Sequence, residues 1–236
     1  MKTNKIIALL LALVMMLTLF AGCSGSDDND PTNTTDENSE YISEDTNTPD
    51  EEPEIEVPTS NSTKPLTRGT INGNVYTNEF ADITFTKHRD WTYKSNEEIA
   101  ELIGYSSDLL DYDLEEIVEK SGSYIDMMVT FPTGSPNLQV TVEDLNFQSI
   151  SHLTPEEYLD LSRQQMLAVN PTYTFGDIYE KELCGHTYTV MDLEAIYGTT
   201  KTLQRLYLRK QGNYMISITM SATAENSFIT MENMFS

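Results

Sequence analysis

The sequence has few of the residues on which metal, redox and nucleic-acid chemistry depend. Its 236 residues include two cysteines, three histidines and one tryptophan, and 14 basic residues stand against 38 acidic ones. His88, His152 and His186 lie far apart and have no partner at metal-ligand spacing, so we expect no metal site. The shortage of Lys and Arg disfavours a nucleic-acid partner, because no basic stripe is available to neutralise phosphates.

A hydrophobic run long enough to cross a membrane comfortably is also missing. Residues 6–20 are apolar except for Thr18, whereas a spanning helix needs about 20 apolar residues. Lys2 and Lys5 precede this run, and the small residues of positions 21–22 follow it. This order is typical of a secretory signal peptide, with an uncleaved anchor as the alternative.

The residues that end the apolar run suggest lipid attachment. Phe20-Ala21-Gly22-Cys23 resembles the lipobox of bacterial lipoproteins, in which Leu is commoner at the first position. The resemblance implies that residues 1–22 are removed and that the Cys23 thiol carries a diacylglycerol. Two or more acyl chains anchor a protein stably, whereas one binds marginally. The alternative is a free cysteine beside an ordinary signal. Lipidation of Cys23 would leave Cys184 without a disulfide partner.

An acidic, polar stretch follows the cysteine. Residues 24–68 contain 13 acidic residues and two basic ones, a net charge of −11. Such a segment cannot bury enough apolar surface to offset its ordering entropy, so we expect a disordered tether. As a random coil, this segment would have an end-to-end distance of about 40 Å. A calcium-binding acidic tail is the alternative interpretation.

Residues 69–236 have the size and patterning of one folded domain. Period-two apolar patterns and glycine-bearing turns predict strands that pair as antiparallel hairpins. Helical spacing and capping residues predict helices between groups of strands. The fold class is therefore α+β, a mainly antiparallel sheet flanked by helices. The expected strands are 78–87, 123–131, 138–145, 175–183, 186–197, 203–210 and 214–222, and the expected helices start at the Ser95 capping box and cover 113–120, 155–169 and 225–235.

The order of these elements resembles the PsbP/Mog1-like family. In that family a strand leads to a Gly-Trp pair and the last helix packs on the sheet. Trp91 and the strand before it match this pattern, although residues 88–90 lack the usual proline. Family members are mostly non-enzymatic: accessory subunits of photosystem II, a cofactor of a small nuclear GTPase, and bacterial lipoproteins. The resemblance implies an accessory role, although a fold alone does not transfer an activity.

Candidate catalytic residues do not assemble into a recognisable set. A nucleophilic site would draw on Cys184, His186 and Asp192. Cys184 and His186 lie two residues apart across a predicted hairpin turn, whereas a triad needs a base that is hydrogen-bonded to both of its neighbours. No phosphate-binding glycine loop and no G-x-S-x-G motif occurs. The acidic residues of 108–116 lack the EF-hand glycine and spacing, so Ca²⁺ binding there is a minor alternative. We therefore predict no catalytic residue, no metal and no cofactor.

The best candidates for a binding surface lie on one expected strand. Arg205, Tyr207 and Arg209 alternate, so they share a strand face that we expect to be exposed, and Tyr and Arg are enriched at interface hot spots. We predict a non-catalytic binding or accessory domain that contacts a protein or another envelope component. An envelope enzyme with an unrecognised site and a solute-binding lipoprotein are the alternatives.

The signal and lipobox generate a direct test. We expect the N-terminal peptide of the mature protein to begin at Cys23 and to carry lipid, which mass spectrometry of native membranes measures. Cys23→Ala should release the protein from the membrane or misplace it. An unmodified Cys23 or a retained Met1 would contradict the prediction.

Overall fold

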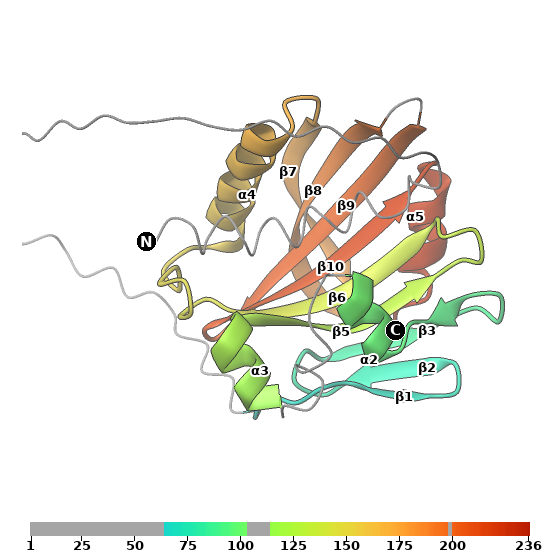
Figure 1. Ribbon diagram of the computed structural model, residues 1–236, viewed down its shortest axis with the longest axis horizontal. Coiled ribbons are helices and arrows are strands. Elements are labelled where there is room, and N and C mark those ends of the chain that lie inside the picture. The colour runs from blue at the N-terminus through green and yellow to red at the C-terminus, as the bar shows by residue number, and fades with distance from the viewer. Residues whose placement is uncertain (1–63, 103–113, 198–199) are drawn as a thin grey trace, which may run out of the picture. The chain divides into compact units, whose positions relative to one another are not determined.

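The computed structural model describes residues 64–102, 114–197 and 200–236, which form ten strands and four helices. Seven strands make one sheet (Figure 1), and every neighbouring pair in it is antiparallel. The predicted α+β class with an antiparallel sheet is therefore confirmed. In spatial order the strands are β4 (Thr92–Tyr93), β5 (Ser123–Thr130), β6 (Asn137–Asp144), β10 (Tyr214–Ala222), β9 (Thr200–Gln211), β8 (His186–Tyr197) and β7 (Thr174–Leu183).

Several predictions concern residues outside this described part. They are the signal peptide 1–22, lipidation at Cys23, the acidic tether as far as residue 63, and most of the acidic group 108–116. They stay predictions. Among the residues that the structure describes, no helix combines the length and apolar character needed to cross a bilayer.

Two tight turns build the hairpins that the sequence predicts. Cys184 and Gly185 have φ values of 53° and 71° and join β7 to β8. Two consecutive positive φ angles are typical of a type I′ turn. Gly212, with φ 59°, is the first of two residues between β9 and β10, the position that a type II′ turn reserves for glycine.

One face of the sheet carries the larger apolar core. Alternate residues of the central strands, among them Val140, Ile218 and Tyr207, are fully buried there. Their partners come from α3 (Leu114–Ser121), α5 (Asn226–Glu232) and a second, three-stranded sheet, which contribute apolar side chains to the same cluster. The three strands are β1 (Thr70–Asn72), β2 (Val75–Asn78) and β3 (Ile83–Thr86).

The small sheet replaces the single strand predicted for residues 78–87. Asp82 has a φ of 50°, so the chain turns between β2 and β3. The turn is held by the large sheet: Gln211 donates to the Phe80 carbonyl and Arg209 donates to the Ala81 carbonyl. The predicted strand is wrong in the middle, because these backbone groups bond to β9 side chains instead of a ladder.

Helix α4 (Pro155–Val169) covers β7, β8 and β9 on the other face. It begins where the sequence predicts: the Thr154 side chain accepts from the Glu157 backbone, and the Glu157 carboxylate accepts from the Thr154 backbone at 2.8 Å. Apolar side chains of α4 pack against the second core cluster. Its members include Leu159, Met166, Met191, Leu193, Leu206 and Leu208.

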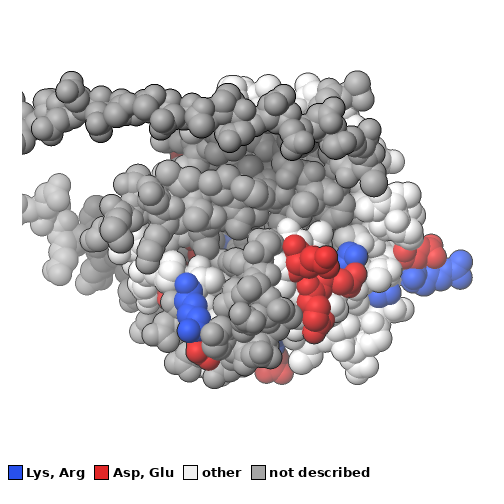
Figure 2. Space-filling view, viewed as in Figure 1, with Lys and Arg blue, Asp and Glu red and all other residues white. Residues whose placement is uncertain are grey.

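Helix α2 (Asn96–Leu102) confirms the predicted capping box at Ser95. The Ser95 backbone donates to the Glu98 carboxylate at 2.8 Å, and the Ser95 hydroxyl accepts from the Glu98 backbone at 3.2 Å. Acidic side chains gather over this helix in Figure 2. Glu97 and Glu98 lie in its first turn. Their place is explained by the helix dipole, which favours carboxylates near the N-terminus.

The start of the domain is held by a buried carboxylate, that of Asp126. Oδ2 of Asp126 accepts from the Gly69 backbone at 2.8 Å, from Asn78 Nδ2 at 2.6 Å and from the Tyr76 hydroxyl. A Cβ at Gly69 would overlap the Tyr76 ring, so this approach needs glycine. Leu66 packs against the core three residues before the domain start that the sequence suggests at Gly69.

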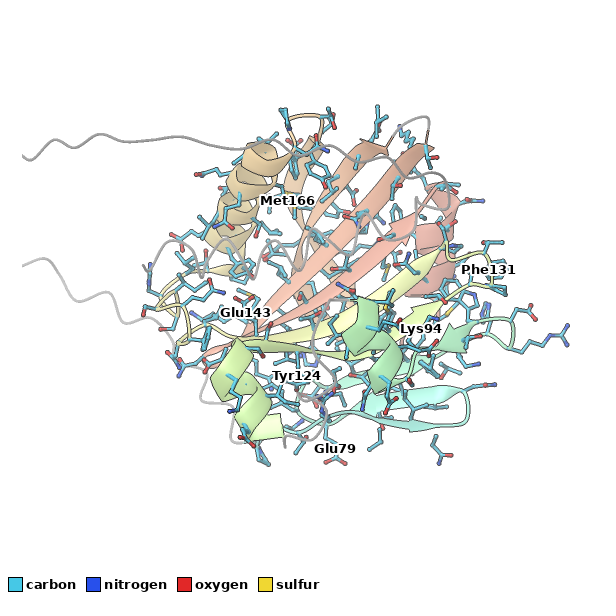
Figure 3. All side chains as sticks on the ribbon, viewed as in Figure 1. Glu79, Lys94, Tyr124, Phe131, Glu143 and Met166 are labelled. Carbon is cyan, nitrogen blue, oxygen red and sulfur yellow. The ribbon has the colours of Figure 1, made fainter. Side chains whose placement is uncertain are left out.

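Glu143 on β6 is a buried acid at the contact with α4 (labelled in Figure 3). The Tyr158 hydroxyl donates to its Oε2, and Gln148 Nε2 donates to its Oε1 at 2.9 Å. Burial raises the pKa of Glu143 to about 7, although the hydrogen bond from Tyr158 lowers it, and the charge of Asp144 raises it further. Desolvation of the carboxylate therefore outweighs its hydrogen bonds.

Glu143 should make the stability depend on pH. Its pKa is raised by folding, so the folded state holds a proton that the unfolded state loses between about pH 4.3 and 7. The stabilisation is present below that range and is lost as pH rises through it, by roughly 4 kcal/mol at most. In urea titrations, we expect the unfolding free energy of Glu143→Gln minus that of wild type to increase with pH, because only wild type loses stability as Glu143 ionises. A difference that is constant from pH 4.5 to 7.5 would contradict this.

Candidate binding pocket around Arg205

A cavity of about 250 Å³ opens beside the ends of β7, β8 and β9 and the start of α5. We call it the Arg205 pocket. Its lining includes the apolar residues Leu203 and Phe228. Phe175 also borders the cavity, but its ring packs with Tyr173 and with Arg163 of α4. Phe175 lies next to the irregular register of β7 between Phe175 and Ile178, where the pairing with β8 shifts. The charged lining residues are Asp192, Glu194, Arg205 and Glu225.

Arg205 is held in the pocket by a forked contact to the neighbouring strand. Its register partner on β8 is Asp192. Nε donates to Asp192 Oδ1 at 2.6 Å, and the Nη2 group donates to Oδ2 at 3.0 Å. Such bidentate pairing fixes the guanidinium plane as well as its position. The guanidinium also lies over the Phe228 ring, 4.7 Å from its centroid.

Helix α5 supplies the second carboxylate of this network. Oε1 of Glu232 accepts from Arg205 Nη1 at 2.8 Å, from Lys181 Nζ at 2.7 Å and from the Tyr207 hydroxyl. Burial alone raises the pKa of Glu232, but the hydrogen bonds from Lys181, Tyr207 and Arg205 lower it by more, so it remains ionised. The three donors tie α5 to β7 and β9.

The same partners keep Arg205 charged. Burial lowers the pKa of Arg205, but the hydrogen bonds to Asp192 and Glu232 raise it by more, so the net direction is upward. Tyr179 donates to Asp192 Oδ2 at 3.3 Å, and burial raises the pKa of Tyr179 to about 12 with help from the Asp192 charge. Arg205 therefore stays charged and Tyr179 stays protonated at neutral pH.

The three residues predicted as a binding surface have different environments. Arg205 and Arg209 share one strand face as expected, but the expectation that this face is exposed is wrong. The Arg205 side chain is 18% exposed, Tyr207 is fully buried, and Arg209 donates to Ala81 at the other end of the strand. Arg205 lines the cavity, and a binding role for the three residues stays a prediction.

The residues considered as a catalytic triad are not brought together. Cys184 lies in the β7–β8 turn, and burial raises its pKa to about 11, which keeps the thiol protonated at neutral pH. His186 follows the turn, and burial lowers its pKa. Asp192 is six residues further along β8, about 20 Å at the usual strand rise, and pairs with Arg205. Within residues 64–102, 114–197 and 200–236, no group of three or more metal-ligating side chains is found.

Sequence reasoning missed the acids that organise the interior. Glu232 adjoins Met231 on the apolar stripe of the last helix, and an acid beside such a stripe is a signal for a buried cation. Glu143 alternates with Gln139 and Thr141 on β6, which indicates a polar face but not a buried one. Asp126 carries no sequence signal that distinguishes it from a surface acid.

Comparison with protein-family models and with curated proteins gave no match. Among solved structures, the chain is similar to the solution structure of cyanobacterial PsbP (CyanoP) from Synechocystis sp. PCC 6803. The identity is 14%, the TM-score is 0.42, and the match covers 74% of this chain and 95% of that one. A crystal structure of a protein from Bacteroides thetaiotaomicron VPI-5482 matches with 12% identity and a TM-score of 0.29, over 66% of this chain and 41% of that one. Both scores are too low to carry an argument, so membership of the PsbP/Mog1-like family stays a prediction.

The network makes Arg205 a stability residue. We expect Arg205→Ala to lower the free energy of unfolding by about 2 kcal/mol, less than the roughly 3–5 kcal/mol for breaking a fully buried pair, because Asp192 is 40% exposed. Arg205→Lys should lower the free energy of unfolding by less, since lysine keeps the charge but cannot make the bidentate contact to Asp192. Arg89→Ala is the control: its side chain is 91% exposed, and chemical denaturation should show no change. An Arg205→Ala protein as stable as wild type would contradict the network.

Proposed function

We propose that the protein is a lipid-anchored binding module that acts at the extracytoplasmic face of a cell membrane. Lipid on Cys23 holds the chain at the bilayer, and the acidic segment 24–68 separates the domain from it. The domain has an accessory role and contacts a protein of the envelope. The signal, the lipobox resemblance and the tether composition support the location.

The Arg205 pocket is the observation that carries the binding role. Its opening combines apolar wall with charged groups, and anchors in pockets dominate the energetics of protein interfaces. Asp192 and Glu232 already fix the orientation of the Arg205 guanidinium. This side chain therefore does not have to be ordered when a partner binds. Preorganisation of this kind lowers the entropic cost of association.

The charged groups of the network around Arg205 favour binding over catalysis. A general acid or base works best with a pKa near the working pH. At the pocket, Arg205 and Glu232 have pKa values displaced away from neutrality, and Tyr179 has one of about 12. These groups hold structure at neutral pH and do not exchange protons there. The raised pKa of Cys184 likewise opposes its use as a nucleophile.

Photocrosslinking in native cells tests the proposed function. A benzoylphenylalanine in place of Glu225, which lines the pocket and is exposed, should crosslink to one discrete envelope protein. The control places the same group at Glu180, an exposed acid of β7. With Cys23→Ala the product from position 225 should disappear, because the domain no longer stays at the membrane.

The outcomes separate a specific contact from crowding. A product from position 225 and none from position 180 supports the binding module at this pocket. Equal products from both positions, or none from either, would sink the proposal that the pocket is the contact site.

A further inference from the structure

Two exposed apolar side chains lie close in the chain to acidic residues that line the Arg205 pocket. The described residues expose five large apolar side chains, and Ile196 and Ile229, at 52% and 61%, are the most exposed of these. Ile196 lies two residues after Glu194 on β8, so both side chains point to the same side of the strand. Ile229 lies one helical turn after Glu225 on α5. Single exposed apolar residues are ordinary, but these two adjoin two acids of the same cavity.

The charge around the opening is acidic once internal pairs are considered. The lining contains three carboxylates and one guanidinium. That guanidinium is engaged by Asp192 and Glu232, and Glu194 pairs with Lys201. Glu225 occupies the N-cap of α5, but its side chain makes no capping hydrogen bond. Its carboxylate therefore stays available at the rim, in a chain with a net charge of −24.

The size of the cavity limits the ligand. About 250 Å³ is below the usual range of roughly 300–1,000 Å³ for small-molecule and cofactor sites. One long side chain suits this volume better than a cofactor. A Lys or Arg side chain has an apolar stem for the walls at Leu203 and Phe228 and a cationic end for the rim.

We infer that the Arg205 pocket accepts a Lys or Arg side chain of a protein partner, with aliphatic neighbours that rest on Ile196 and Ile229. This inference rests on the proposed binding function and adds the chemistry of the partner. Glu225 is the rim acid that receives the cation. An acidic or phosphorylated segment is disfavoured, because the rim carries the uncompensated charge of Glu225. Asp192 and Glu194 are already paired with Arg205 and Lys201.

Three short peptides test the inference with the full-length protein purified in detergent. They are acetyl-Leu-Arg-Leu-amide, acetyl-Leu-Gln-Leu-amide and acetyl-Leu-Glu-Leu-amide, and saturation-transfer difference NMR measures their binding. We expect the arginine peptide to bind about fivefold more tightly than the glutamine peptide, as one exposed ion pair allows. The glutamate peptide should bind most weakly.

Two variants locate the effect. Glu225→Lys should weaken the arginine peptide about fivefold or more, while the glutamine peptide changes little. Glu180→Lys makes the same charge change on an exposed β7 residue and should leave both affinities unchanged. Thermal unfolding checks that the two variants are folded to the same extent.

Other outcomes overturn the inference. An arginine peptide that binds no better than the glutamine peptide excludes cation recognition. Equal weakening by Glu180→Lys and Glu225→Lys shows general attraction to an acidic protein. Either result can occur together with a specific crosslink from position 225, in which case the binding module stands and only the proposed chemistry of its partner fails.

Discussion

The pairing of β6 with β10 is the contact on which the rest of the sheet depends. Eight register pairs, from Asp144 with Tyr214 to Asn137 with Ser221, join two groups of strands that α4 separates in the chain. Without this ladder each group would present an unpaired edge, and the apolar face would be divided. With it, Val140 and Ile218 lie side by side, and one continuous core forms beneath α3, α5 and the small sheet.

Register then decides where the charges lie. Arg205 is opposite Asp192 on one side and opposite Met220 on the other. A slip by one residue would turn every β9 side chain to the other face, and Arg205 would lose both Asp192 and the Glu232 carboxylate of α5. The pocket is therefore a consequence of the sheet pairing and of the return of the last helix, and not of a local motif.

Local signals in the sequence were sufficient to predict most of the helices and strands. The capping box at Thr154 and the glycine-bearing turn at Gly185 act over four or fewer residues, and the structure confirms both. Long-range contacts had no such signal. The splitting of the strand near Asp82 depends on Arg209 and Gln211, more than 120 residues away, and Glu232 acquires its role only when the helix meets β9. Composition likewise suggested an exposed Arg205, because a half-buried cation depends on partners that only folding brings near.

The distribution of charge separates attraction from selectivity. The electrostatic attraction of a strongly acidic chain is screened beyond about 8 Å at physiological salt, and it chiefly affects the rate at which a basic partner associates. The network around Arg205 contributes little to that field, since the charges of Arg205, Lys181, Asp192 and Glu232 compensate one another at close range. Discrimination therefore depends on the rim, where Glu225 has no internal capping bond, and on the fit of an apolar stem inside. A domain with this arrangement can repel an anionic membrane surface and still hold one cationic side chain.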